Sequence, residues 1–225
     1  MFDEVFDLAV RNAVARYAAV NRLGRGMMRG KLRVDPVYRE LLDRGIGKAG
    51  KVVDLGCGRG LLFSLILAAQ GGAEGPTLHG IEIAPDAARA ARLALTGAAT
   101  IVEGDLGDTA IPPCDVVTLL DVAHYLPVAV QDDLLVRARR ALPEGGRLFV
   151  READAAAGAG FLAVRVSERL AAIAGGNGLR RFAYRAVSDL SRRLELAGFT
   201  VTATPMGRGT PFSNVLLEAR ACARA

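Results

Sequence analysis

The chain has 225 residues, of which 51% are hydrophobic, 24% charged and 5% aromatic, and its formal net charge is +5 at pH 7. These fractions are those of an ordinary globular protein and exclude a disordered, collagen-like or coiled-coil chain. The longest mainly apolar run, Leu61–Leu67, is far shorter than the roughly 20 residues that cross a bilayer. Cys57, Cys114 and Cys222 fit neither a disulfide framework nor a CxxC metal site. With no apolar signal segment after the acidic Met1–Glu4, we expect a cytoplasmic protein without a metal or a membrane span.

Residues 1–47 are predicted to form a helical lid in front of the main domain. Apolar residues recur at helical spacing over residues 2–20 and predict a first amphipathic helix. We expect the glycines of Gly24–Lys31 to interrupt it as a hinge. A second helix is predicted over Pro36–Arg44, with Asp35 as its N-cap and Pro36 at its first position.

The segment from Arg11 to Arg33 is strongly basic. It holds seven basic residues and no acidic one: Arg11, Arg16, Arg22, Arg25, Arg29, Lys31 and Arg33. Such a segment is either a solvated helix face or a surface for an acidic partner, such as a phosphorylated substrate, a carrier protein, a membrane or RNA.

From Lys51 onward, short apolar runs alternate with helical stretches. The predicted strands are Lys51–Leu55, Thr77–Ile83, Ala99–Glu103, Asp115–Leu120, Arg147–Arg151, Phe199–Pro205 and Asn214–Ala219. The predicted helices are Leu61–Gln70, Pro85–Leu95, Val128–Ala141, Phe161–Ala174 and Ser188–Ala197. This alternation predicts an α/β fold with a parallel sheet that is buried on both faces. Because no helix separates the last two strands, we expect them to pair antiparallel at one edge.

A glycine-rich turn follows the first predicted strand. The run Val52–Leu62 passes from a buried strand through Gly56, Gly58 and Gly60 into a helix, where a doubly wound sheet binds a nucleotide-like ligand. The spacing is not that of a dinucleotide site, which requires glycine at the position of Leu61, and no Gly-Lys-Ser/Thr of a P-loop follows. Asp54, two positions before the first glycine, would repel a pyrophosphate and suits a cationic ligand.

Carboxylates also follow the next two predicted strands. Glu82 lies about 20 residues beyond the glycine turn, where an acidic residue accepts hydrogen bonds from a ribose diol. Asp105 follows the third strand and could accept from an exocyclic amine. Since parallel strands end at the same edge of a sheet, we expect Asp54, Glu82 and Asp105 to share one site.

Together these motifs resemble the class I S-adenosylmethionine-dependent methyltransferases. The resemblance rests on Asp54–Gly60, Glu82, Gly104–Asp105, Asp121 and Leu142–Gly146. It covers about residues 48–152 and extends loosely to the hairpin Phe199–Ala219. It implies a Rossmann-like, doubly wound sheet of seven strands, mostly parallel with a reversed C-terminal strand, in one domain over residues 48–225.

The resemblance also implies S-adenosylmethionine as cofactor and S-adenosylhomocysteine as product. The turn with Gly56, Cys57, Gly58 and Gly60 would wrap the methionine part, and Asp54 would bond its amino group. Glu82, with Ile83 beside it, would take the ribose hydroxyls. Asp105 and the backbone of Leu106 would hold the adenine. Asp121 would face the methionine amine and the reacting centre.

The acceptor side is expected after the fourth strand, in Leu120–Pro127. His124 is the best-placed general base and Tyr125 the second candidate. The alternative for His124 is a structural or cofactor-facing ring. The insertion Ala153–Tyr184 is predicted to be a lid on the acceptor side, in which Arg180, Arg181 and Tyr184 could face an acidic or phenolic acceptor. The alternative for this insertion is a solvated loop with an aromatic anchor.

The absence of several motifs narrows the range of possible methyl acceptors. No Asn-Pro-Pro-Tyr or Asp-Pro-Pro-Tyr follows the fourth strand, and no lysine follows Lys51 to build a ribose 2′-O-methylation site. Cys114 precedes that strand and is expected to be a buried small hydrophobe.

We therefore expect O-methylation of a small phenolic, polyketide-like or lipid-like molecule, presented free or by an acidic carrier protein. The alternatives are an RNA methyltransferase, which the lack of interleaved aromatics disfavours, and a non-catalytic scaffold that binds the cofactor. A nicotinamide dehydrogenase is disfavoured by the glycine spacing.

Overall fold

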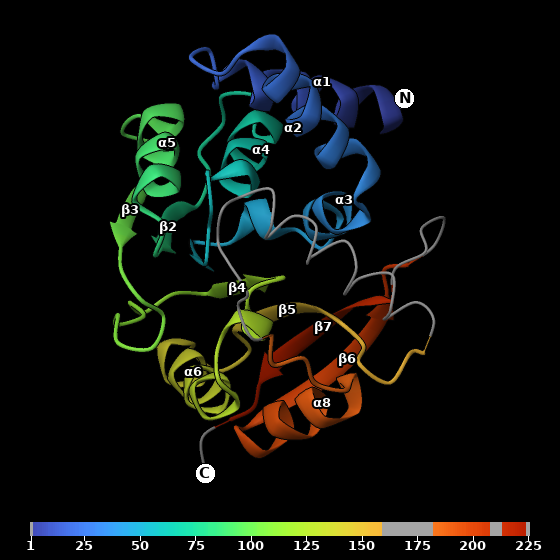
Figure 1. Cartoon of the computed structure of the whole chain (residues 1–225). Coiled ribbons are helices and arrows are strands. Elements are labelled where there is room, and N and C mark those ends of the chain that lie inside the picture. Colours follow the sequence, from blue (N-terminus) through green and yellow to red (C-terminus); the bar gives the residue numbers. More distant parts are fainter. Residues whose placement is uncertain (1, 159–181, 208–212, 224–225) are drawn as a thin grey trace. The chain divides into compact units, whose positions relative to one another are not determined.

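The computed structural model describes residues 2–158, 182–207 and 213–223 (Figure 1). The chain forms two compact units, Met1–Val116 and Val117–Ala225, called here the first and the second unit. The predicted helix over Phe161–Ala174 and the residues Arg180 and Arg181 lie outside the described residues.

The strands form a seven-stranded sheet in the order β3-β2-β1-β4-β5-β7-β6. They are β1 (Lys51–Leu55), β2 (Thr77–Glu82), β3 (Thr100–Glu103), β4 (Val116–Leu120), β5 (Arg147–Ala153), β6 (Phe199–Pro205) and β7 (Asn214–Ala221). Strands β1, β2 and β3 are parallel, whereas β7 is antiparallel to both β5 and β6. The order is that of a doubly wound sheet with a reversed strand inserted before the edge. The predicted α/β class, the seven strands and the reversed C-terminal strand are confirmed.

In the first unit, N-terminal helices pack on the helix that follows the glycine turn. The helices are α1 (Phe2–Ala15), α2 (Arg22–Val34), α3 (Pro36–Asp43), α4 (Leu61–Ala69) and α5 (Pro85–Leu95), with a 3-10 turn, η1 (Ile46–Lys48). Ser64 Oγ of α4 donates to the Ala13 carbonyl of α1 at 2.8 Å. Just after α1, the buried Tyr17 hydroxyl donates to the Arg59 carbonyl in the glycine turn at 2.9 Å. These contacts join the N-terminal segment to the turn.

The predicted glycine hinge is wrong, because α2 runs through Gly24, Gly26 and Gly30 as a continuous helix. Glycine costs a helix about 1 kcal/mol relative to alanine. Two contacts offset this cost: the Asn21 side chain caps the helix by accepting from Gly24 N, and Leu32 is fully buried. The first helix also ends earlier than predicted, at Ala15.

The next helix is as predicted. In α3, Asp35 caps Val37 N and proline opens the helix.

The second unit packs two helices with β5, β6 and β7 (Figure 1). These are α6 (Val128–Ala141) and α8 (Val187–Leu196), and a 3-10 turn, η2 (Ala123–Tyr125), precedes α6. The buried Arg139 of α6 donates to the carbonyls of Leu142, Gly198 and Cys222. One guanidinium thus joins the end of α6, the start of β6 and the end of β7.

Candidate functional site

The glycine turn between β1 and α4 has a backbone that only glycine adopts readily. Gly56, Gly58 and Gly60 have φ of 76°, 55° and 77°, in the left-handed region. At Gly60, a Cβ would also lie 2.7 Å from Leu95 Cδ1. At Gly58, a Cβ would meet no atom within 4 Å. The backbone at Gly58 therefore borders open space that a ligand can approach.

The other residues of the turn face different environments. The Cys57 side chain is buried against β2, because a Cβ on Gly80 would lie 2.6 Å from its sulfur. Burial raises the pKa of the Cys57 thiol. The Cys57 N–H donates to the Ile81 carbonyl at 3.1 Å, and the Cys57 carbonyl accepts from Gly60 N at 2.9 Å. Asp54 is buried at 5% exposure in β1, whereas Arg59 is exposed and directed outward.

Glu82 connects the glycine turn to the start of α5. Its Oε2 accepts from Gly58 N and its Oε1 from Ala84 N, both at 2.8 Å. A carboxylate offers about four acceptor positions, so these two bonds leave capacity for ribose hydroxyls. Next to it, Ile83 exposes 55% of its surface, which provides apolar area for a base.

Asp105 ends the series of carboxylates in the first unit. It is exposed after β3, and its Oδ1 accepts from Gly107 N at 2.7 Å in a local turn. The Leu106 side chain is buried, so its backbone is the part that could meet adenine. Since β1, β2 and β3 are parallel, Asp54, Glu82 and Asp105 lie at the carboxyl end of the same sheet segment.

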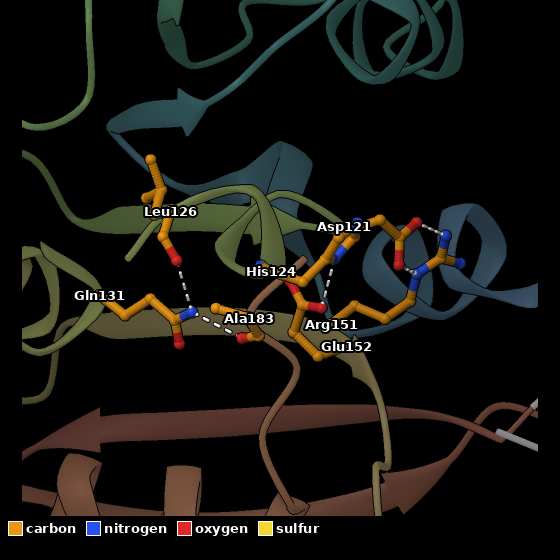
Figure 2. A network of polar contacts seen from close by, with 7 residues as sticks. All are labelled: Asp121, His124, Leu126, Gln131, Arg151, Glu152 and Ala183. Atoms are coloured by element: carbon orange, nitrogen blue, oxygen red, sulfur yellow. Dashed lines mark hydrogen bonds and ion pairs between the residues drawn. The ribbon is translucent and has the colours of Figure 1, made fainter. Parts of the chain in front are cut away.

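In the second unit, Asp121 pairs with a buried arginine. Among the described residues, Asp121 is the one non-glycine residue with positive φ, 56°. Its Oδ1 accepts from Arg151 Nε at 2.8 Å and its Oδ2 from Arg151 Nη2 (Figure 2). Its backbone N–H donates to the Arg151 carbonyl at 2.9 Å. The sequence did not predict this guanidinium partner, and contact with the methionine amine stays a prediction.

His124 forms a buried pair with Glu152. The Nδ1 of His124 lies 2.7 Å from Glu152 Oε2, and the two side chains are 4% and 5% exposed (Figure 2). Burial raises the pKa of Glu152 above its ordinary value of 4.5, while the bond with His124 acts in the opposite direction. When Glu152 is ionised it accepts the Nδ1 proton, which leaves the lone pair on Nε2. This is the arrangement of a base held by an orienting carboxylate.

Aromatic rings surround this histidine. The Tyr184 ring stacks on His124 with centroids 4.7 Å apart and an interplanar angle of 14°. Tyr125 and Phe182 lie 4.3 and 5.8 Å from the imidazole, and Tyr125 is 40% exposed. We call His124, Tyr125, Phe182 and Tyr184 the aromatic cluster.

The predicted site residues thus form two sets. Asp54, the glycine turn, Glu82, Ile83, Asp105 and Leu106 belong to the first unit, and Asp121, His124 and Tyr125 to the second.

Sequence reasoning missed Glu152 as the partner of His124. A signal was present: Arg151 and Glu152 are consecutive charged residues that directly follow the apolar run Leu148–Val150, and buried charges are rare without a partner or a function.

In the described part of the chain, no group of three or more His, Cys, Asp or Glu residues could hold a metal. Over the same residues, no helix has the length and apolarity that a membrane span requires. Cys114 is a buried small residue, as predicted, and burial raises its pKa to about 12.

The fold is that of known methyltransferases. Mitomycin 7-O-methyltransferase superposes with a TM-score of 0.66 and 24% identity, over 87% of this chain and 56% of that one. Magnesium protoporphyrin IX methyltransferase from Synechocystis PCC 6803, solved with bound SAH, gives a TM-score of 0.62 and 23% identity, over 90% of this chain and 88% of that one.

Sequence comparisons agree with the fold. Demethylspheroidene O-methyltransferase of Rhodobacter capsulatus is 33% identical over 117 residues, which are 52% of this chain and 28% of that protein. The profile of a methyltransferase-domain family matches residues 28–204. Because that match spans well over half of the chain, the protein belongs to this methyltransferase-domain family.

Proposed function

We propose that the protein is an S-adenosylmethionine-dependent methyltransferase that methylates a hydroxyl of a small phenolic, polyketide-like or lipid-like acceptor. The observation that carries this proposal is the buried His124–Glu152 pair, 2.7 Å apart, next to aromatic rings. Such a pair supplies an oriented base, which a hydroxyl acceptor needs. O-methyltransferases among the similar proteins support the same reaction class.

The first unit carries the groups that fit the cofactor. The open side of Gly58 leaves room for close backbone approach, and Asp54, Glu82 and Asp105 suit a cationic nucleoside better than a phosphate. In this assignment Gly56, Gly58 and Gly60 line the methionine part, Glu82 and Ile83 the ribose side, and Asp105 with Leu106 the adenine. S-adenosylmethionine, when bound, supplies a methyl group on a cationic sulfur.

The second unit carries the groups for proton transfer. His124 Nε2 takes the proton of the acceptor hydroxyl as the oxygen becomes the nucleophile. Glu152 accepts the Nδ1 proton and stabilises the imidazolium that results. Tyr125 lies next to the imidazole and is 40% exposed, and we assign it to contact with the acceptor.

An acidic carrier for the acceptor is the finer part of the proposal. Its support is α2, which has five basic residues and no acidic one, with Leu23 and Met27 exposed at 75% and 70%. The same helix contains no aromatic residue, which disfavours RNA, since single-stranded RNA is bound largely by base stacking.

Calorimetry and methyl transfer test the proposed function together. We expect the purified protein to bind S-adenosylmethionine and to transfer a labelled methyl to members of a phenol panel that includes catechol and 2,3-dihydroxynaphthalene. Cofactor binding without methyl transfer to any phenol or to RNA would favour the scaffold alternative, and absence of cofactor binding would contradict the proposed function. Label transferred to RNA and to none of the phenols would favour the RNA alternative.

A further inference from the structure

A short segment from the end of the insertion is bonded to the turn that carries His124. We call Phe182-Ala183-Tyr184 the strap. The Ala183 N–H donates to the His124 carbonyl at 2.8 Å. Gln131 Nε2 of α6 donates both to the Ala183 carbonyl and to the Leu126 carbonyl, each at 2.9 Å (Figure 2). Strap and turn are therefore joined directly and through one amide group.

Gln131 is suited to this task because it is buried and its donors are used. Its side-chain amide has two N–H groups, and both reach carbonyls of segments far apart in the chain. The residue is 2% exposed, so water does not readily replace these bonds. A side chain without donors would leave two carbonyls short of partners in a buried place, which disfavours this arrangement.

The next residue on α6 fixes the residue that follows the strap. Asp132 accepts from Arg185 Nη1 at 2.5 Å, and Arg185 also donates from Nε to Asp189 at 2.6 Å. Consecutive residues of α6, Gln131 and Asp132, thus hold Ala183 and Arg185. The backbone of Tyr184 is anchored on both sides, which sets where its ring meets His124.

The strap contributes two rings to the aromatic cluster. Tyr184 stacks on the imidazole, and Phe182 meets Tyr125 edge-on with centroids 5.4 Å apart. Stacked and edge-to-face pairs are the arrangements that aromatic rings favour. A change in the position of the strap therefore changes how the rings of the aromatic cluster lie, while the His124–Glu152 pair remains.

We propose that Gln131 is a positioning residue that fixes the strap against His124 and thereby makes the enzyme selective for planar, extended aromatic acceptors. This inference rests on the proposed function, in which the aromatic cluster receives the acceptor. Gln131 does not touch the reacting atoms; it acts through the strap.

The test compares Gln131→Leu with Asp133→Asn. The first keeps the size of the side chain and removes both donors. The second alters an exposed residue of the same helix whose carboxylate pairs with Arg137. For Gln131→Leu we expect kcat/KM for 2,3-dihydroxynaphthalene to fall about tenfold, more than for catechol, with the Kd of S-adenosylmethionine unchanged. Asp133→Asn should match the wild type in all three quantities.

An unchanged ratio of the two kcat/KM values in Gln131→Leu would overturn the proposal.

Hydrogen exchange provides a readout that needs no activity. The Ala183 amide should be protected in the wild type and exchange faster in Gln131→Leu, and an amide that exchanges freely in the wild type would also overturn it. If neither diol is methylated while Ala183 is protected, the assigned acceptor class fails and the role of Gln131 in holding the strap stands. Should Gln131→Leu not fold, an Ala183 amide that exchanges freely in the wild type still overturns the proposal.

Discussion

The glycine turn of the first unit and the aromatic cluster of the second are held in different ways. At the turn, backbone groups do the holding: the Glu82 carboxylate accepts from two main-chain N–H groups. Around His124, side chains from three separate segments hold one another, through Glu152, Gln131 and the rings of the strap. Both arrangements join residues that are distant in the chain, since Glu82 lies 24 residues beyond Gly58, but the first rests on main-chain groups and the second on side chains.

The largest effect is expected where one side chain orients another. Glu152→Gln keeps the shape but removes the charge that stabilises protonated His124, so kcat should fall about a hundredfold. The Kd of S-adenosylmethionine, measured by calorimetry, should stay at the wild-type value. A kcat within twofold of the wild type would show that His124 does not need its carboxylate partner.

The same pair predicts opposite pH dependences of activity and stability. Burial raises the pKa of Glu152 in the folded protein above 4.5, its value when unfolded. The protonated form is therefore favoured by folding, and this contribution to stability is lost as pH rises from 4.5 through the folded pKa. Activity should rise over the same range, because only ionised Glu152 leaves the lone pair on Nε2. Denaturant unfolding at a series of pH values should show that the wild type loses stability relative to Glu152→Gln as pH increases.

A smaller effect is expected from a substitution that removes the Glu82 carboxylate from the glycine turn. Glu82→Ala removes the acceptor of two N–H groups and, in the proposed assignment, of the ribose hydroxyls, so cofactor binding should weaken by about 1–3 kcal/mol. Glu103→Ala is the matched control, since Glu103 ends the neighbouring strand and lies opposite Glu82 in the register. Equal cofactor affinity in the two variants would remove Glu82 from the site.

The smallest effect concerns the contact from the N-terminal segment to the glycine turn. Tyr17→Phe removes the hydrogen bond to the Arg59 carbonyl and should cost about 1 kcal/mol of stability. It should also raise the Kd of S-adenosylmethionine a few-fold, because the turn is less firmly held. Tyr38→Phe removes the hydroxyl of another buried tyrosine of the same unit, on α3, and should leave that Kd unchanged.

The sequence predicts the region around the glycine turn better than the surroundings of His124. The strands, the reversed C-terminal pair and the positions of Asp54, Glu82 and Asp105 were predictable, because each depends on a local run of residues. The partner of His124 was not, since Glu152 lies 28 residues further along the chain and its role depends on pairing through the fold. The helix α2 was mispredicted because its glycines obscured the cap at Asn21 and the buried Leu32.

The strap shows the limit of sequence reasoning most clearly. Tyr184 was expected in a lid on the acceptor side, and its ring stacks on His124. Nothing local in Gln131 or Ala183 indicates that one amide group joins them, because the two residues are 52 positions apart.

The role of His124 as the general base is tested by measuring two quantities for His124→Ala: its turnover and its affinity for S-adenosylmethionine. If His124 is the general base, kcat for a methylated phenol should drop by about two orders of magnitude or more, and calorimetry should give the wild-type Kd for S-adenosylmethionine. Full turnover in that variant would contradict the assignment of His124 as the base and would show that the buried imidazole is a structural ring.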